Sequence, residues 1–195
     1  MATVLLQVMA AAVLLRLPAP TLAEEPVLVD EPALAEESTL AEESTLAEES
    51  TLPTPQGRVL LEVHGAVGRT NGDGVAQFDR AMLEALPRAQ LDTGTSVTDG
   101  VHHFEGVLMR DLLASVQAHG RTVVATALND YVMTFDIAEF DRYDVLAAWS
   151  MDGNALQPSD KGPLWIVYPR NDHKELQDIR YDYRWVWQLV RLEVQ

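Results

Sequence analysis

A hexapeptide repeat, Leu-Ala-Glu-Glu-Ser-Thr, divides the chain into a part that can fold and a part that cannot. The repeat occurs three times, at 34–39, 40–45 and 46–51, and a related Leu-Ala-Glu-Glu-Pro occupies 22–26. A period of six matches neither the helix nor the strand, and each unit offers one leucine for burial. Residues 24–57 carry ten acidic residues and no basic one, so self-repulsion predicts an extended acidic linker there. A tail that docks on a partner is the alternative, and the folded domain is expected over 58–195.

The first 23 residues have the pattern of a secretory signal peptide. Residues 4–17 are almost wholly apolar, Pro18 and Pro20 interrupt the run, and small residues precede a cleavage position after Ala23. This pattern predicts export with removal of residues 1–23. No basic residue precedes the apolar run, so an uncleaved membrane anchor is the alternative, although the run is short for a membrane span.

The charge of the chain and its lack of cysteine exclude several kinds of function. The sequence has 30 acidic and 14 basic residues and a formal net charge of −16, which repels the phosphate backbone of a nucleic acid. It contains no cysteine, so this chain offers no disulfide, no thiolate nucleophile and no cysteine ligand for zinc. A hydrophobic content of 47% is enough for one domain with a real core.

Hydrophobic patterning over 58–195 predicts a mixed α+β domain in which sheet predominates. Strands are expected at 58–64, 122–128, 131–137, 145–151, 164–168 and 185–194, with Asn129-Asp130 as a turn. A helix is expected between Asp79 and Pro87. A second helix is expected over 108–116, with Gly120 as its left-handed C-cap. The run at 164–168 is apolar on both faces, as in a central strand, so short helices should cover the sheet.

The histidines lack the spacing of a metal site. His102 and His103 are adjacent, so on a strand their side chains point to opposite faces. The other three histidines are scattered along the chain. Zinc is therefore not expected, and His103 is considered as the wall of a ligand pocket. Residues 71–74, Asn-Gly-Asp-Gly, lack the later carboxylates of a calcium loop and are interpreted as a turn.

Four stretches of the domain together resemble a known fold family. They are TDGVHHFEGVLMRDLL (98–113), ALNDY (127–131), KGPLWIVYPRND (161–172) and RWVWQLVRLEV (184–194). In this order they are similar to the small stand-alone members of the sulfite-oxidase-like molybdopterin-binding fold. The resemblance covers essentially all of 58–195, and it implies a sulfite-oxidase-like mixed β-sheet domain with short covering helices.

The catalytic branch of that family binds molybdenum through a cysteine thiolate, in a segment that corresponds to 92–98. Here the segment contains Ser96 and Thr98 and no cysteine, so thiolate ligation is excluded. An alkoxide of either residue is the remaining candidate ligand, although an alcohol ionises far less readily than a thiol. The chain more closely resembles exported bacterial pterin-binding proteins that lack molybdenum chemistry. That resemblance implies a pterin ligand, and no molybdenum is expected.

A pterin is a flat heterocycle with a hydrogen-bonding edge, so its site needs aromatic faces and matched donors and acceptors. The candidate ligand-binding residues are Ser96, His103, Asp130, Lys161, Tyr168, Arg170, Arg184 and Trp185. Trp185 and Tyr168 supply ring faces, a carboxylate such as Asp130 accepts hydrogen bonds, and the basic residues donate them. Asp160 and Asp172 are further candidates for the acceptor, whereas Trp165 and Trp187 are expected in the core.

Structural roles are the alternatives for several of these residues. Arg170 could form an ion pair with Asp172 or Asp178. Asp130 could belong only to the turn between two strands. Lys161 could be a solvated loop charge. The sequence leaves these alternatives open.

The resemblance also implies a function. It implies a noncatalytic periplasmic protein that senses a pterin. Such a protein would regulate a membrane-bound enzyme of cyclic di-GMP synthesis and degradation, and thereby biofilm formation. The expected partner is the periplasmic region of that transmembrane enzyme, and the acidic linker would supply reach. A molybdopterin-dependent oxidoreductase with a non-cysteine molybdenum ligand is the alternative. A scaffold that has lost its pterin cleft is a third interpretation.

Overall fold

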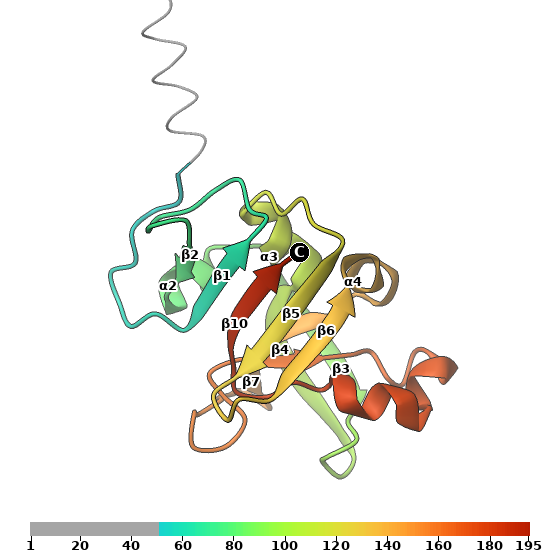
Figure 1. Cartoon of the computed structure of the whole chain (residues 1–195). Helices are drawn as coiled ribbons and strands as arrows, with labels where there is room; N and C mark the ends of the chain where they lie inside the picture. The colour runs from blue at the N-terminus through green and yellow to red at the C-terminus, as the bar shows by residue number, and fades with distance from the viewer. Residues whose placement is uncertain (1–50) are drawn as a thin grey trace, which may run out of the picture.

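Two β-sheets form the body of the protein, and short helices lie against them (Figure 1). The computed structural model describes residues 51–195, so the signal peptide expected over 1–23 and most of the acidic linker lie outside the described residues. The strands are β1 (Leu61–Gly65), β2 (Ala76–Phe78), β3 (Arg88–Gly94), β4 (Val101–Leu108), β5 (Thr122–Ala127), β6 (Val132–Asp136), β7 (Leu146–Met151), β8 (Asn154–Ala155), β9 (Trp165–Val167) and β10 (Leu189–Val194). The helices are α2 (Arg80–Glu84), α3 (Met109–Ser115), α4 (Ile137–Tyr143) and the 3-10 helices η1 (Lys174–Gln177) and η2 (Ile179–Arg184). The mixed α+β prediction is confirmed.

The first sheet joins the two ends of the domain. Its strand order is β2-β1-β10-β5-β6, and β1 pairs in parallel with β10. Glu62 lies opposite Arg191 in this pairing, and the two side chains approach to 3.7 Å. Because the first and the last strand of the domain are neighbours, the sheet is complete only when the whole domain has folded.

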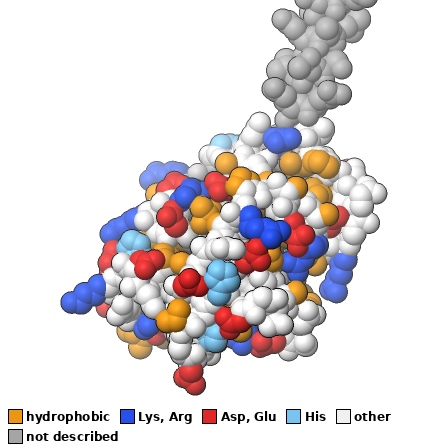
Figure 2. Space-filling model, turned by 180° about the vertical axis from the view of Figure 1, so that it is seen from behind, with side chains coloured by type: hydrophobic (Ala, Val, Ile, Leu, Met, Phe, Trp, Pro, Cys, Tyr) orange, Lys and Arg blue, Asp and Glu red, His pale blue; other side chains and the backbone are white. Residues whose placement is uncertain are grey.

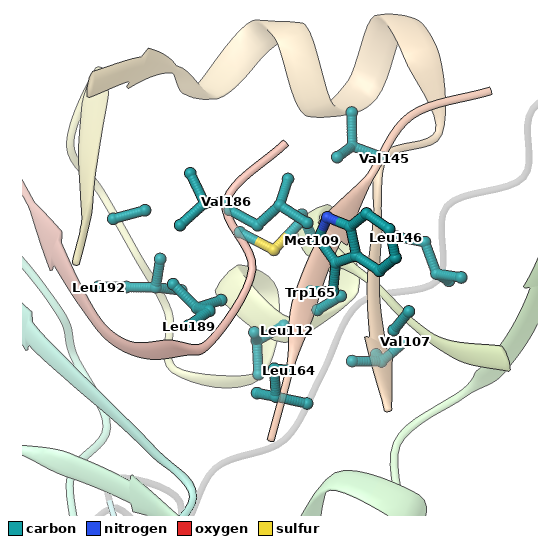
Figure 3. Packing of buried hydrophobic residues seen from close by; sticks show 14 of the residues in the cluster. Val107, Met109, Leu112, Val145, Leu146, Leu164, Trp165, Val186, Leu189 and Leu192 are labelled. Carbon is teal, nitrogen blue, oxygen red and sulfur yellow. The ribbon is translucent and has the colours of Figure 1, made fainter. Parts of the chain in front are cut away.

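The second sheet supplies the most deeply buried strands. Its strand order is β3-β4-β7-β8. Strand β8 pairs with the end of β7, at Ser150 and Met151, whereas β9 pairs with the beginning of β7, at residues 146–148. All three residues of β9 are buried, as the apolar run at 164–168 predicts. Trp165 lies among Val107, Met109 and Leu146 (Figure 3). Its ring also meets Phe104 edge to face, with 5.4 Å between ring centres.

Residues 51–57, which the sequence assigns to the linker, pack on the folded domain. The Leu52 N–H donates to the carbonyl of Thr70 (3.0 Å), and Asn71 Nδ2 donates to the carbonyl of Pro53 (2.7 Å). Asp79 then accepts from the N–H groups of Gln56 and Gly57 through one oxygen while its other oxygen caps α2. The expected boundary at residue 58 is therefore too late, because backbone hydrogen bonds that the composition does not reveal fix the preceding residues.

Several expected elements differ from the observed ones. The strand expected over 131–137 ends at Asp136, whose carboxylate accepts from the Ala138 N–H (3.0 Å) and begins α4. Gly120 is not the C-cap of α3, since the left-handed residue there is Gln117 (φ 51°). A Cβ on Gly120 would lie 2.5 Å from the carbonyl oxygen of Gln195, so this glycine permits a close approach of two backbones. The last strand begins at Leu189, which leaves Trp185 outside it.

The described residues also bear on the metal and membrane expectations. Among residues 51–195, no group of three or more His, Asp or Glu side chains is placed to hold a metal ion. Within the same residues, no helix has the length and apolar character needed to cross a membrane. Residues 71–74 form a bend, with the Gly74 N–H donating to the carbonyl of Gly72 (2.7 Å), which agrees with the interpretation as a turn.

Replacement of Phe104 by alanine tests the packing around Trp165. Phe104 is fully buried, so Phe104→Ala should lower the free energy of unfolding by about 3–5 kcal/mol. Urea unfolding followed by circular dichroism measures this loss. Val101→Ala, at a 60% exposed position of the same strand, should change the same quantity by less than about 0.5 kcal/mol. Equal effects of the two substitutions would contradict the assigned core.

Acid titration tests the role of Asp79. Hydrogen bonds, first from the Met82 N–H and then from Gly57, hold the pKa of Asp79 below its ordinary value of 3.8. The ionised carboxylate therefore stabilises the fold above that ordinary pKa, and this contribution is lost as the pH falls through the lower folded-state pKa. Asp79→Asn should lower the urea midpoint at pH 7, and its difference from the wild type should shrink below about pH 4. A difference that is the same at pH 7 and pH 3 would refute this role.

Candidate functional site

Residues of three segments line an aromatic cavity. The segments are the β3–β4 connection, the β5–β6 turn, and the end of η2 with the residues that follow it. The lining residues are Val97, Asn129, Tyr131, Asp182, Tyr183, Trp185 and Trp187, around a volume of about 180 Å³. Aromatic rings predominate in this lining, so a flat ligand could stack in the cavity.

Local hydrogen bonds hold two of these segments in place. In the β5–β6 turn, Asp130 has a left-handed backbone (φ 63°) and its N–H donates to the carbonyl of Ala127 (3.1 Å). The Tyr131 hydroxyl donates to the carbonyl of Tyr183 (2.7 Å), which ties the turn to the end of η2. Burial, and secondarily Tyr183, raises the pKa of Tyr131, so its hydroxyl stays protonated as the donor.

The third segment, the β3–β4 connection, folds around a threonine hydroxyl. Thr95 is buried, and its Oγ1 accepts from the N–H groups of Val97 (3.1 Å) and Thr98 (2.9 Å). The Oγ1 atoms of Thr95 and Thr98 are also 2.7 Å apart. These hydrogen bonds hold Val97 beside the cavity, and they occupy the hydroxyls of Thr95 and Thr98 in the segment in which the family's metal ligand was expected.

Trp185 forms the wall between the cavity and the core. Its side chain is buried, with its ring centre 6.3 Å from that of Trp165 and 6.1 Å from that of Tyr168. Trp165 belongs to the core, as expected. Trp187, also expected in the core, is only half-buried and lines the cavity, because it lies in the connection before β10 and not within a strand.

Two lining side chains keep a polar atom without a partner. Among the described residues, Asp182 Oδ1 and Trp185 Nε1 are both buried and form no hydrogen bond. A buried polar group without a partner costs about 1–3 kcal/mol, and such groups are rare in folded proteins. One is an acceptor and the other a donor; both belong to residues that line the cavity, although neither atom has exposed surface there.

A second cavity of about 290 Å³ adjoins the first one. Its lining consists of Val97, Asp160, Lys161 and Trp187, so the two cavities share Val97 and Trp187. Lys161 Nζ donates to Asp160 (2.9 Å) and lies 5.8 Å from the centre of the Trp165 ring. The two cavities together contain two carboxylates and one ammonium group, which favours a neutral ligand over an anionic one.

Tyr168 and Arg184, both expected as ligand contacts, meet at Glu139 behind Trp185. The Tyr168 hydroxyl donates to Glu139 Oε1 (2.9 Å), and Arg184 Nη1 donates to Glu139 Oε2. Tyr168 is 1% exposed, and burial followed by the nearby Glu139 charge raises its pKa well above the ordinary value. The Arg184 guanidinium also lies 5.3 Å from the centre of the Tyr181 ring. Both residues therefore support the cavity wall and do not line it.

The other predicted site residues are dispersed. Asp130 is exposed in its turn, and Ser96 is exposed beside Val97; neither belongs to the lining of the cavity. His103 is exposed on β4, with its Nδ1 2.7 Å from Asp92. Of the eight candidates, the structure brings only Trp185 into the aromatic cavity and Lys161 into the adjoining one.

Arg170 takes neither of the roles considered for it. It does not line the two cavities, and in the described part of the chain it forms no ion pair with Asp172 or Asp178. Its Nε is buried without a hydrogen-bond partner. Asp178 pairs with Arg180 instead (2.8 Å). The two carboxylates considered as partners of Arg170 are therefore not paired with it.

Asp182 is the functional candidate that sequence reasoning missed. It lies in the segment Tyr181-Asp182-Tyr183, where no strand or helix pattern marks a pocket. The available signal was a carboxylate between two aromatic residues, three positions before Trp185. The 3-10 helix η2, which the hydrophobic pattern does not predict, places both residues in the same wall.

The fold and the cavity define a two-sheet domain suited to bind a flat heterocycle, and the comparisons with known proteins identify its family. Residues 77–181 match the model of the oxidoreductase molybdopterin binding domain. The chain belongs to this family, which agrees with the sulfite-oxidase-like fold expected from the sequence. Comparison with curated proteins gives no match.

A solved structure supports the same fold. The sulfane dehydrogenase SoxCD from Paracoccus pantotrophus superposes with a TM-score of 0.54 and 18% sequence identity. The match covers 73% of this chain and 39% of that chain, so the similar region spans well under half of the dehydrogenase chain. At this identity the similarity shows the fold alone.

The cavity fits the pterin part of molybdopterin better than its metal part. Trp185 and Trp187 offer ring faces, and Asp182 and Trp185 each carry a buried polar atom without a hydrogen-bond partner. The sequence has no cysteine to supply a thiolate, and the hydroxyls of Thr95 and Thr98 hydrogen-bond to each other. The residues present thus suit a heterocycle, and the chain offers no thiolate ligand for molybdenum.

A double-mutant cycle tests the support behind Trp185. Glu139→Ala leaves the buried Tyr168 hydroxyl without an acceptor and should lower the free energy of unfolding by about 1–3 kcal/mol. In a Tyr168→Phe background the same substitution should cost clearly less, because no hydroxyl remains to satisfy. Urea unfolding of the four proteins measures the coupling. Asp141→Ala, an exposed position on the same helix, is the control, and strictly additive losses would contradict the assigned contact.

Proposed function

We propose that the protein is an exported, noncatalytic pterin-binding module that acts in the periplasm. The observation that carries this proposal is the pair of unsatisfied atoms, Asp182 Oδ1 and Trp185 Nε1, in residues that line an aromatic cavity. The pyrimidine ring of a pterin carries amino and ring N–H groups that can donate to Asp182. Its carbonyl or a ring nitrogen can accept from Trp185. Membership of a molybdopterin-binding family supports a pterin as the ligand class.

The proposed role is regulation by ligand occupancy. The sequence resembles the bacterial periplasmic pterin-binding protein PruR, and on that resemblance the partner is the periplasmic region of a transmembrane enzyme of cyclic di-GMP synthesis and degradation. Bound pterin would change the affinity of the module for that partner, and so alter biofilm formation. The ligand can shift this equilibrium only by as much as its affinity differs between the free and the partner-bound module.

The charges of the two cavities favour a pterin without a phosphate. The two linings contain the carboxylates of Asp160 and Asp182 and a single ammonium group, that of Lys161, which pairs with Asp160. Molybdopterin carries a phosphate group, and this lining offers it no unpaired cation. Charge thus supports a simple pterin as the preferred ligand.

The alternative function is a molybdopterin-dependent oxidoreductase with an oxygen ligand to the metal. The family and the exposed hydroxyl of Ser96, beside the cavity residue Val97, favour this alternative. In such a protein Trp185 and Trp187 would hold the pterin, and the molybdenum would supply redox chemistry. Metal analysis of protein purified from cells supplied with molybdate separates the two functions. Stoichiometric molybdenum would overturn the noncatalytic proposal.

Substitution of Asp182 tests the proposed ligand contact. A hydrogen bond to a charged group contributes about 1.5–3 kcal/mol, so Asp182→Asn should weaken the binding of a reduced or oxidised pterin about ten- to hundredfold. Trp185→Phe keeps a ring face but removes the donor, and it should weaken binding by a smaller factor. Isothermal titration calorimetry of the full chain measures both affinities. Asp130→Asn, which alters an exposed carboxylate outside the lining, should leave the affinity within about twofold, because it removes no ligand contact.

Two outcomes would contradict the proposed site. The absence of saturable binding by the wild type would support the scaffold interpretation. Equal weakening by Asp182→Asn and Asp130→Asn would place the ligand elsewhere. Circular dichroism of each variant verifies that the fold is retained.

A further inference from the structure

The exposed large hydrophobic side chains of the described residues gather around the cavity. Residues 51–195 contain seven of them, with exposed fractions between 39% and 70%. They are Val97 and Val101 in the β3–β4 hairpin, Leu128, Tyr131 and Val132 in the β5–β6 hairpin, and Ile179 and Tyr183 in η2. All three segments border the cavity. We call these seven residues the mouth surface.

This gathering is local. Over most of the face seen in Figure 2, hydrophobic side chains are scattered between acidic and basic ones. Large apolar side chains clustered at a single end of a molecule mark an interaction site more often than isolated ones do. Three of the seven, Val97, Tyr131 and Tyr183, also line the cavity. The mouth surface is therefore continuous with the wall that would hold the ligand.

The mouth surface also contains a sheet edge. β6 is the last strand in the order β2-β1-β10-β5-β6, and in the described part of the chain it pairs only with β5. Val132, the first residue of β6, is 54% exposed. An edge strand has backbone donors and acceptors that a partner segment can use. Apolar contact and backbone pairing are thus available at the same place.

The charged groups beside the mouth surface are acidic. Asp99 lies between Val97 and Val101, and Asp130 lies between Leu128 and Tyr131. Both are exposed, and among residues 51–195 neither forms a salt bridge. Nearby Arg180 is already paired with Asp178 (2.8 Å). The unpaired charge at this end of the molecule is consequently negative.

We propose that the mouth surface docks a protein partner whose contact face is apolar and fringed with lysine or arginine. A second copy of this chain would bring its own Asp99 and Asp130 against the same acids, which like charges oppose. An anionic membrane would also be repelled. A cationic fringe complements the acids and leaves the apolar residues to be buried. Tyr131 and Tyr183 belong both to the cavity and to the docking face, so a bound partner would cover the mouth of the cavity. The affinity of the partner for this chain would then depend on whether the cavity holds its ligand. This coupling rests on the proposed pterin-binding function.

Site-specific photocrosslinking in the native host tests the docking face. A benzophenone amino acid is placed at Val132 of the full chain, and at Glu84 on α2 as the control, since Glu84 is exposed but lies outside the mouth surface. The expected result is a protein adduct at least tenfold more abundant from Val132 than from Glu84. Mass spectrometry should map it to an apolar segment with lysine or arginine within a few residues.

Substitutions at the same face test whether the adduct depends on apolar contact and on negative charge. Leu128→Asp should reduce the adduct from Val132 at least tenfold because it places a charge in the apolar contact. Asp99→Lys should reduce it more than Asp99→Asn does, and this difference should diminish at high salt. An adduct with a second copy of the chain, an adduct with lipid, equal labelling from both positions or no adduct from Val132 would each overturn the proposal.

Pterin titration of the same variants distinguishes failure of the docking face from failure of the proposed function. Neither Leu128 nor Asp99 lines the cavity, so Leu128→Asp and Asp99→Lys should retain pterin affinity within about twofold, which is the size expected for surface changes. If the wild type binds no pterin while the Val132 adduct forms as expected, the proposed function fails and the docking face stands. If pterin binds and no adduct forms, the docking face fails alone.

Discussion

The contact of Trp185 with the buried aromatic residues beside β9 determines the shape of the candidate site. Trp165 and Tyr168 are both fully buried, and their ring centres lie within 6.3 Å of that of Trp185. Close-packed interior side chains have few alternative rotamers, so the cavity wall takes its rigidity from the core. Glu139 extends this support to α4 by accepting from Tyr168 and Arg184. A residue in a connecting segment is thereby held as firmly as one in a strand.

The absence of cysteine leaves the candidate site without a thiolate for a metal but with its aromatic lining. A family whose model describes molybdopterin binding is represented here by a chain without any thiol. What the chain retains is an aromatic lining with the unpaired Asp182 Oδ1 and Trp185 Nε1. Each of these buried atoms destabilises the ligand-free protein. A ligand that satisfies both removes that cost, which adds to its affinity and makes the contact selective for complementary heterocycles.

The sequence predicts the parts of the fold that periodicity encodes and misses those that tertiary contacts create. The two-faced apolar run at 164–168 predicts a strand buried on both faces, and β9 is buried throughout. The central position also expected for it is wrong, because among the strands of residues 51–195 β9 pairs only with β7. η2 has no hydrophobic period, so the placement of Asp182 could not be foreseen. Its aromatic ring and its place at the end of an expected strand marked Tyr168 as a ligand contact, but only the fold shows that its hydroxyl is already used by Glu139. Trp185 was accessible to sequence reasoning because it has an aromatic face and was expected at the beginning of the last strand, although that strand begins at Leu189.

In the proposed function, coupling between ligand and partner would follow from shared residues and would need no long-range conformational change. The Tyr131 hydroxyl donates to the carbonyl of Tyr183, which links the β5–β6 turn to the end of η2. Asp182 and Trp185 flank that carbonyl in sequence and line the cavity. A ligand that orders these two side chains also orders the tyrosines of the mouth surface, and a partner that binds the ordered surface gains affinity. Thermodynamic linkage then requires that the partner raise the affinity for the ligand by the same factor.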